Sequence, residues 1–241
     1  MDFKTTSKYF DNISNVFRYI GFGALAVGVV LFLLNLILDM FQLMSMGIIL
    51  IVIGVVLVVF DSGRRTKDTD LEKFIHLELD KMPEKAADKM ESDRRHLHEI
   101  QKYEFYSYDF RDLDSVKVKR GSDSRLRSSK VYYTALYYVT EAHHAKVMIY
   151  ENGFSLLKYD RTENLTEIPE ENLESAELVQ KTVSVMPVGA KGPSEYTYAL
   201  INIATSDGKV ISFPAKNDAT SDDVVATINR SIRKRKLEAG E

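Results

Sequence analysis

The sequence contains no cysteine, and this absence excludes a disulfide-stabilised extracellular scaffold. It also removes the thiolate ligands of structural zinc sites. A basic excess is missing as well, because 32 Lys and Arg stand against 35 Asp and Glu in 241 residues, a formal net charge of -3. A dedicated nucleic-acid-binding protein carries such an excess. We therefore expect no nucleic acid among the partners.

Two segments near the start of the chain lack charge altogether. They run from Tyr19 to Leu38 and from Leu43 to Phe60. A helix of about 20 residues spans about 30 Å, the thickness of the hydrocarbon core of a bilayer. The first segment is longer than the apolar part of a signal peptide, and no small-residue cleavage pattern follows it. The sequence therefore predicts a two-helix transmembrane hairpin over residues 17–60, after a short segment, residues 1–16.

Positive charges flank both ends of this hairpin and are absent from its turn, which carries only Asp39. The flanking cations are Lys4, Lys8, Arg18, Arg64, Arg65 and Lys67. Positively charged flanks favour the cytoplasmic side when a membrane protein inserts. We expect a multi-pass protein of the cell membrane, with two helices in the membrane and both termini in the cytoplasm.

Small residues gather on the faces of both hairpin helices. They are Gly21, Ala24 and Gly28 in the first helix and Gly47 and Gly54 in the second. Such residues let helix backbones approach closely. Two interpretations stay open, packing within the hairpin or a surface for another membrane protein or a second copy. Because Asn35 is the one strongly polar side chain in the first span, a transporter that works as a monomer is not expected.

Residues 61–104 are polar and predict a cytoplasmic helical connector. Apolar residues recur near the helical period of 3.6 at Leu71, Phe74, Ile75, Leu79 and Met82. Pro83 can open a second helix. Apolar positions after Pro83 are sparse, so we expect a mostly solvated helix that separates the next domain from the bilayer.

Residues 105–241 differ in composition and contain short segments rich in Val, Tyr, Ile and Thr. About seven antiparallel strands are predicted. The main candidates are Val131–Thr140, Lys146–Tyr150, Phe154–Tyr159, Leu173–Met186, Tyr196–Thr205 and Lys209–Pro214, and the weaker ones are Glu104–Phe110 and Ser115–Arg120. Glu151-Asn152-Gly153 predicts one hairpin turn, and Ser206-Asp207-Gly208 predicts another. The alternation of a strand leaves about half of the tyrosines between Val131 and Thr140 facing a core.

The chain ends in an amphipathic helix. Val224, Val225, Ile228 and Ile232 form one apolar stripe, and Asp222 and Asp223 lie in the first turn, where the helix dipole favours acids. An antiparallel sheet that bends strongly leaves an open end, which this stripe can cover. The sequence therefore predicts an α+β fold: transmembrane α-hairpin, helical connector, bent antiparallel sheet and covering helix.

Three segments between Ala145 and Lys236 carry a family resemblance. They are AKVMIYENGFSLLKYD, the run from Ile168 to Ala176, and ATSDGKVISFPAK leading into DDVVATINRSIRKRK. Together they resemble the bacterial pleckstrin-homology-like domains of small membrane proteins. The resemblance implies a bent antiparallel β-barrel capped by the C-terminal helix, and a non-enzymatic binding or assembly platform. The loop Pro187–Pro193 is longer than the family pattern needs.

A basic segment lies between two of the predicted strands. It runs from Lys117 to Lys130 and contains six cations, Lys117, Lys119, Arg120, Arg125, Arg127 and Lys130. In pleckstrin-homology domains that bind lipid headgroups, the loop between the first two strands is basic, and this segment resembles that arrangement. Arginine and lysine suit a phosphate group. The alternative is a solvated loop whose charges pair with Asp109, Asp112 and Asp114.

No pattern of catalytic residues accompanies these features. The chain has no G-x-S-x-G motif, no Walker-type loop, no zinc-ligand spacing and no paired-carboxylate motif. His96 and His98 point about 200° apart on a helix, and His143 and His144 face opposite sides of a strand. We therefore expect no catalytic site, no metal site and no cofactor.

The leading hypothesis is a membrane-anchored scaffold whose cytoplasmic domain, residues 105–241, mediates protein–protein interaction or self-assembly at the inner leaflet. The alternative is a module that binds anionic lipid through the basic segment. The expected partners are membrane lipids and either another protein or a second copy of the chain.

Overall fold

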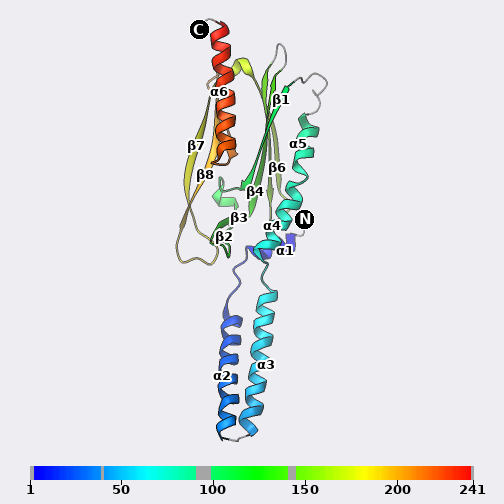
Figure 1. Cartoon of the computed structure of the whole chain (residues 1–241), viewed down its shortest axis with the longest axis vertical. Coiled ribbons are helices and arrows are strands. Elements are labelled where there is room, and N and C mark those ends of the chain that lie inside the picture. Colours follow the sequence, from blue (N-terminus) through cyan, green and yellow to red (C-terminus); the bar gives the residue numbers. More distant parts are fainter. Residues whose placement is uncertain (1–2, 39–40, 91–98, 141–144, 240–241) are drawn as a thin grey trace. The chain divides into compact units, whose positions relative to one another are not determined.

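The computed structural model describes residues 3–38, 41–90, 99–140 and 145–239 (Figure 1). Contacts within the chain divide it into two compact units. Asp11–Leu71 form the first, which we call the hairpin unit. Met1–Phe10 and Glu72–Glu241 form the second, which we call the β-rich domain. The fold class is α+β, as predicted, because helices and antiparallel strands occupy separate stretches of the chain.

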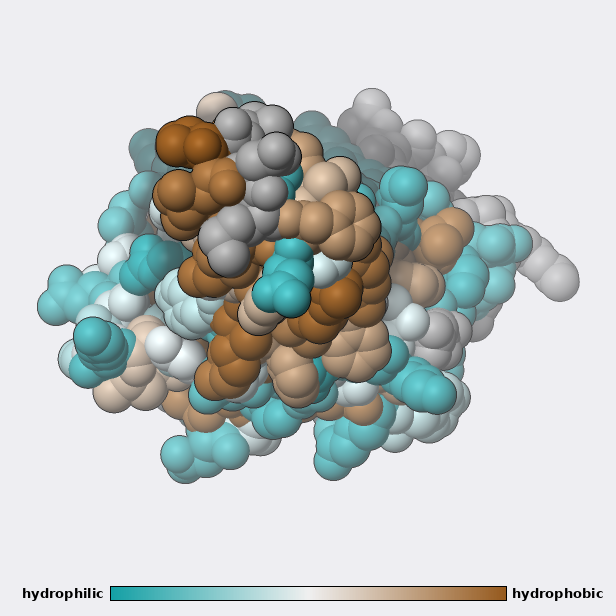
Figure 2. Space-filling view, turned by 90° about the horizontal axis from the view of Figure 1, so that it is seen from below, coloured by the Kyte–Doolittle hydropathy of each residue, from teal (hydrophilic) through white to brown (hydrophobic). Residues whose placement is uncertain are grey.

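The hairpin unit consists of two helices, α2 (Val16–Leu38) and α3 (Phe41–Gly63). Both are long and apolar enough to cross a membrane. Most of their large apolar side chains are exposed, among them Phe22, Ile49 and Val56. Figure 2, seen from below, shows brown apolar residues over much of the hairpin helices. Helix α3 ends at Gly63.

The β-rich domain contains three separate antiparallel sheets. The four-stranded sheet has the order β1 (Glu99–Tyr108), β4 (Lys130–Thr140), β5 (Lys146–Ser155) and β6 (Arg161–Pro169). The three-stranded sheet has the order β7 (Leu173–Val185), β8 (Ser194–Thr205) and β9 (Val210–Ala215). The short strands β2 (Val118–Arg120) and β3 (Leu126–Ser128) pair with each other.

One core joins both large sheets to the C-terminal helix α6 (Ala219–Ala239). The predicted stripe is confirmed, because Val224, Ile228 and Ile232 are all buried in this core. They pack with residues such as Leu136 of β4 and Ile201 of β8. Full burial of each such side chain contributes about 1.5–3 kcal/mol, which fixes α6 on the sheets.

The other face of the four-stranded sheet is also covered. Helices α4 (Asp68–Leu79) and α5 (Met82–Met90) precede β1, and α5 lies against β4 and β5. Figure 1 shows α5 beside this sheet, on the side away from α6. All four tyrosines of β4 are therefore buried, whereas alternation predicts only half of them in a core: Tyr132, Tyr133, Tyr137 and Tyr138.

The interpretation of the connector as a solvated helix is wrong. Several apolar residues of α4 and α5 are buried, among them Ile75, Leu79, Met82, Ala86 and Met90. Residues from Glu99 onward already belong to β1. Pro83 lies in the first turn of α5, as predicted. The histidines at positions 96 and 98 lie outside the described residues, as do those at 143 and 144.

The predicted turn at Glu151-Asn152-Gly153 is wrong as well. Strand β5 continues through these residues to Ser155, and the chain turns over residues 156–160. Strand β6 then occupies Arg161–Pro169, where the sequence pattern predicts no strand. The reason is that β5 pairs along its length with β4 on one side and β6 on the other, so ladder hydrogen bonds outweigh the local turn preference.

The second predicted turn is confirmed. The Gly208 amide donates to the Thr205 carbonyl at 2.8 Å, and Gly208 has a φ of +78°, which glycine adopts without strain. β8 and β9 follow each other through it.

The closed PH-like barrel is not confirmed. Nine strands are described rather than about seven, and they form open sheets of four, three and two strands. The Pro187–Pro193 loop joins β7 to β8, and its Val188 amide donates to the Val118 carbonyl of β2 at 2.7 Å.

Candidate functional site

The basic segment Lys117–Lys130 is a folded hairpin. Lys119 of β2 lies directly opposite Arg127 of β3, and the Gly121 amide closes the turn on the Arg125 carbonyl at 2.8 Å. Like charges in directly opposite positions repel, so each needs a counter-charge or an acceptor nearby. The structure supplies one for each of the two.

Arg127 binds two acids from different elements. Its Nη1 and Nη2 donate to Oδ1 and Oδ2 of Asp123 at 2.8 and 3.2 Å, and its Nε donates to Glu72 Oε1 of α4 at 3.1 Å. The Arg127 side chain is only 7% exposed, and bidentate pairing of this kind offsets the cost of burying its charge. The Arg127 guanidinium lowers the pKa of Asp123 to about 2.

Glu72 also accepts a hydrogen bond from the Tyr108 hydroxyl of β1 at 2.9 Å. Burial of the Tyr108 ring and the adjacent Glu72 charge both raise the pKa of this phenol, so Tyr108 stays a neutral donor. The carboxylate of Glu72 thus joins α4 to both β1 and β3.

Lys119 binds the N-terminal helix α1 (Phe3–Tyr9). Its Nζ donates to the Tyr9 carbonyl at 2.5 Å and lies 4.9 Å from the centre of the Tyr9 ring. A cation at the last carbonyls of a helix is favourable, and contact with the ring adds to it. Tyr9 and Thr6 are buried, and Thr6 Oγ1 donates to the Leu156 carbonyl at 2.5 Å.

These residues form one group that we call the anchoring cluster: Tyr9, Glu72, Tyr108, Lys119, Asp123 and Arg127. It lies within the β-rich domain and binds α1 and α4, the two helices that adjoin the hairpin in the sequence. Five residues separate Phe10 from Val16, and eight separate Gly63 from Glu72. No sequence signal links Glu72 to Arg127, because they are 55 positions apart.

The remaining cations of the segment have varied surroundings. Arg120 donates to the Ser124 carbonyl at 2.9 Å and to Ser194 Oγ at 2.7 Å. Lys130 donates to Ser115 Oγ at 2.7 Å and lies 3.7 Å from Asp112, one of the acids named as partners from the sequence. Arg125 points outward, with 86% of its side chain exposed. Lys117 is exposed, and its backbone amide donates to Ser129 Oγ.

Asp109 binds a cation outside the basic segment. Arg111 donates to both of its carboxylate oxygens, at 3.0 and 2.9 Å. Arg111 also reaches Glu151 Oε1 at 3.5 Å. Burial raises the pKa of Glu151, although Arg111 opposes that change.

The small residues of the hairpin unit face one another. A Cβ on Gly28 would lie 2.8 Å from the Gly47 carbonyl oxygen, and one on Gly54 would lie 2.8 Å from the Gly21 carbonyl oxygen. Ala24 is half-buried between these two levels of α2. The glycines therefore serve packing within the hairpin, which was the first of the two interpretations.

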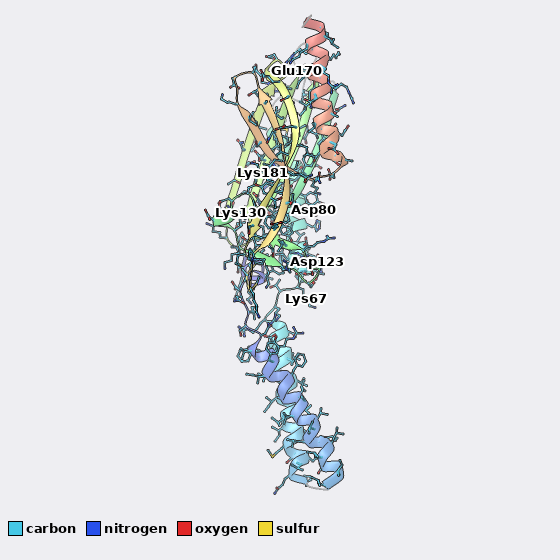
Figure 3. All side chains as sticks on the ribbon, turned by 90° about the vertical axis from the view of Figure 1, so that its left-hand side faces the viewer. Lys67, Asp80, Asp123, Lys130, Glu170 and Lys181 are labelled. Atoms are coloured by element: carbon cyan, nitrogen blue, oxygen red, sulfur yellow. The ribbon has the colours of Figure 1, made fainter. Side chains whose placement is uncertain are left out.

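A cleft of about 390 Å³ lies between α6 and the end of the four-stranded sheet. Its lining includes Gln101, Tyr138, Glu170, Arg230 and Lys234. The Tyr138 hydroxyl bonds to Glu170 Oε1 at 2.9 Å and to Ser231 Oγ at 2.6 Å. Figure 3 shows Glu170 and Asp123 toward opposite ends of the domain, so this cleft is separate from the anchoring cluster.

The described residues offer no cluster of three or more acids and histidines that could hold a metal ion. Comparison of the chain with known protein families, with curated proteins and with solved structures finds no match.

Proposed function

We propose that this chain is a non-enzymatic, membrane-anchored scaffold whose β-rich domain binds a protein partner or a second copy at the cytoplasmic face of the membrane. The anchoring cluster is the observation that carries the proposal. Lys119 and Arg127 are two cations of the short β2–β3 hairpin. They bind α1 and α4, the helices that precede α2 and follow α3 in the sequence. A domain that holds both connections in its own fold stays tethered to the membrane anchor through two short segments of chain.

The hairpin unit supports the proposed location in a membrane. Its large apolar side chains are exposed at many positions, and water does not tolerate a continuous apolar surface of that extent. Its polar backbone groups are satisfied within helices, as a bilayer requires.

The arrangement of the termini supports the proposed topology. Helices α1 and α6 belong to the same compact domain, although α2 and α3 lie between them in the sequence. A chain that crosses the membrane twice returns to the side from which it entered. The flanking cations assign that side to the cytoplasm.

The alternative, anionic-lipid binding by the basic segment, has less support. Lys119, Arg120, Arg127 and Lys130 all donate to protein acceptors, which reduces their availability to a phosphate group. Arg125 is the cation of this segment best placed to meet a headgroup. The kinship with bacterial pleckstrin-homology-like domains stays a prediction from the sequence pattern.

The test is the mass of the intact complex, released from the native membrane in a mild detergent. A scaffold gives a mass well above 27.5 kDa plus detergent, with a second polypeptide or several copies. A monomer without a stoichiometric partner contradicts the proposal. A monomer that carries bound anionic lipid, lost on Arg125→Ala, favours the alternative.

A further inference from the structure

Strand β7 forms one edge of the three-stranded sheet, and α6 packs against this strand. The Asn229 side chain of α6 accepts from the Ala176 amide at 2.9 Å and donates to the Ala176 carbonyl at 2.8 Å. Arg235 donates to the Leu173 carbonyl at 2.7 Å. These contacts replace the missing neighbouring strand as far as Ala176.

The rest of the edge is open. The Ala176 groups point away from β8, and the pairing with β8 is regular from Ser175 to Val185. Because backbone groups alternate along an antiparallel strand, those of four further residues also point away from β8. They are Leu178, Gln180, Thr182 and Ser184, and their amides and carbonyls have no hydrogen-bond partner among the described residues.

The edge strand β6 of the other sheet is joined to two helices by ion pairs. Arg161 of β6 pairs with Glu78 of α4 at 2.8 Å, and Glu163 of β6 lies 3.9 Å from Lys89 of α5. The stretch Leu178–Ser184, which we call the open edge, has no such helix beside it. An unpaired row of amides and carbonyls is a template for an additional strand.

The side chains of the open edge define what that strand must carry. Val179, Lys181 and Val183 share one face of β7; both valines are half-buried and Lys181 is exposed. Lys181 has no ion pair among the described residues, and Figure 3 shows its position on β7. Directly opposite residues in neighbouring strands interact most strongly. A matching strand therefore places an acidic side chain against Lys181 and apolar ones against the two valines.

A second copy of β7 does not meet this requirement. Glu177 is the acid of β7 that shares the face of Lys181. The antiparallel register that sets Glu177 against Lys181 also sets Ala176 against Thr182, and the Ala176 backbone groups are already bound by Asn229. The register centred on Lys181 brings two lysines together, which repel.

We infer that the open edge Leu178–Ser184 receives an extended segment of a different protein, with an acidic residue opposite Lys181 and apolar residues opposite Val179 and Val183. This inference rests on the proposed scaffold function and names the kind of partner. The lysine in the middle of the edge opposes pairing with strands that lack an acid, so it selects among partners.

Because the chain contains no cysteine, an introduced cysteine is the only thiol on this chain that a maleimide can label. The full-length chain with Ser184→Cys, in its native membrane, is labelled with a photoreactive maleimide and illuminated. Gln180→Pro blocks the edge without removing a bond to β8, because the Gln180 amide points away from β8. Gln180→Ala is its matched control. Lys181→Glu reverses the selecting charge, and Lys181→Arg keeps it.

The expected product is the chain joined to a second, different polypeptide. Its yield falls about tenfold in Gln180→Pro and in Lys181→Glu and is retained in Gln180→Ala and Lys181→Arg. Lys181→Glu keeps the test valid if Gln180→Pro does not fold, since an exposed charge reversal leaves the domain intact.

Three results overturn the inference: a product of two copies of this chain, a product that Lys181→Glu does not reduce, or no product at all. If the intact complex still contains a second polypeptide in these cases, the open edge is wrong and the scaffold stands. If the complex contains no other chain, the proposed function fails too.

Discussion

The guanidinium of Arg127 binds the carboxylate of Asp123 through two hydrogen bonds, at 2.8 and 3.2 Å, and its third nitrogen binds Glu72 of α4. An arginine in a segment whose sequence suggests lipid binding is thus part of an internal network. The position of this side chain joins α4 to β3, and two predictions follow from it.

Replacement of Arg127 by methionine should destabilise the β-rich domain by about 2–4 kcal/mol, because two acids lose their buried partner. Urea unfolding of the full-length protein in detergent, followed by tyrosine fluorescence, measures the change. The exposed neighbour offers the control, since Arg125→Met should alter the free energy of unfolding by less than about 0.5 kcal/mol. Equal effects of the two substitutions would refute the role of Arg127.

Replacement of Lys119 by alanine should loosen α1. The helix has seven residues and is too short to persist without its contacts to the domain. Limited proteolysis should cut between Phe3 and Phe10 faster in Lys119→Ala than in the unaltered protein. Lys209→Ala, which removes an exposed cation elsewhere, should leave the cleavage rate unchanged. If both variants are cut alike, Lys119 does not hold α1.

Stability should depend on acid through Asp123. Its pKa is about 2 in the folded protein and 3.8 for an unperturbed aspartate, so the folded state favours the ionised form. The stabilisation is fully present above about pH 4 and is lost as the pH falls toward 2. The difference in unfolding free energy between the unaltered protein and Asp123→Asn should shrink over this interval. A difference that is constant or grows toward low pH would contradict the assignment.

Replacement of Gly28 by leucine should separate the two hairpin helices. A side chain there meets the Gly47 carbonyl oxygen and Ile51, both 2.8 Å from the new Cβ. Spin labels on cysteines introduced at Ile20 and Val59 should report a longer and broader distance. Gly23→Leu is the matched control in the same helix, because nothing lies within 4 Å of a Cβ at that position. An unchanged distance in Gly28→Leu would show that the helices do not pack at this point.

Replacement of Asn229 by alanine should cost about 1–3 kcal/mol, because the amide and the carbonyl of Ala176 both lose their partner. Asn229→Asp keeps an acceptor for the amide and loses the donor to the carbonyl, so its effect should be intermediate. Thermal unfolding of the three proteins at one detergent concentration gives the order. An aspartate variant less stable than the alanine variant would contradict the expected order.

Local patterns predicted several elements correctly. The apolar stripe of α6 is buried as expected, and the turn at Ser206–Gly208 has the geometry that glycine permits. Both depend on residues that are close in the sequence. The Asn152-Gly153 turn failed for the complementary reason, since a strand paired on both sides overrides a local preference.

The sequence predicted the candidate site only as a cluster of positively charged residues. The sequence identifies six cations in one segment, but it does not distinguish a phosphate from an internal acid as their partner. That choice depends on where α1 and α4 lie. The apolar positions of α5 also look too sparse for a packed helix until the outer face of the four-stranded sheet is known to need cover.

The sequence by itself determined the two apolar helices, the α+β class and the amphipathic C-terminal helix, because each follows from the spacing of neighbouring residues. The tertiary structure decided which charges meet. Lys119 and Tyr9 are 110 positions apart, and Arg127 and Glu72 are 55 apart. Contacts over such separations form only when the sheets and helices have packed. The folded chain therefore decides whether the basic segment binds itself or another molecule.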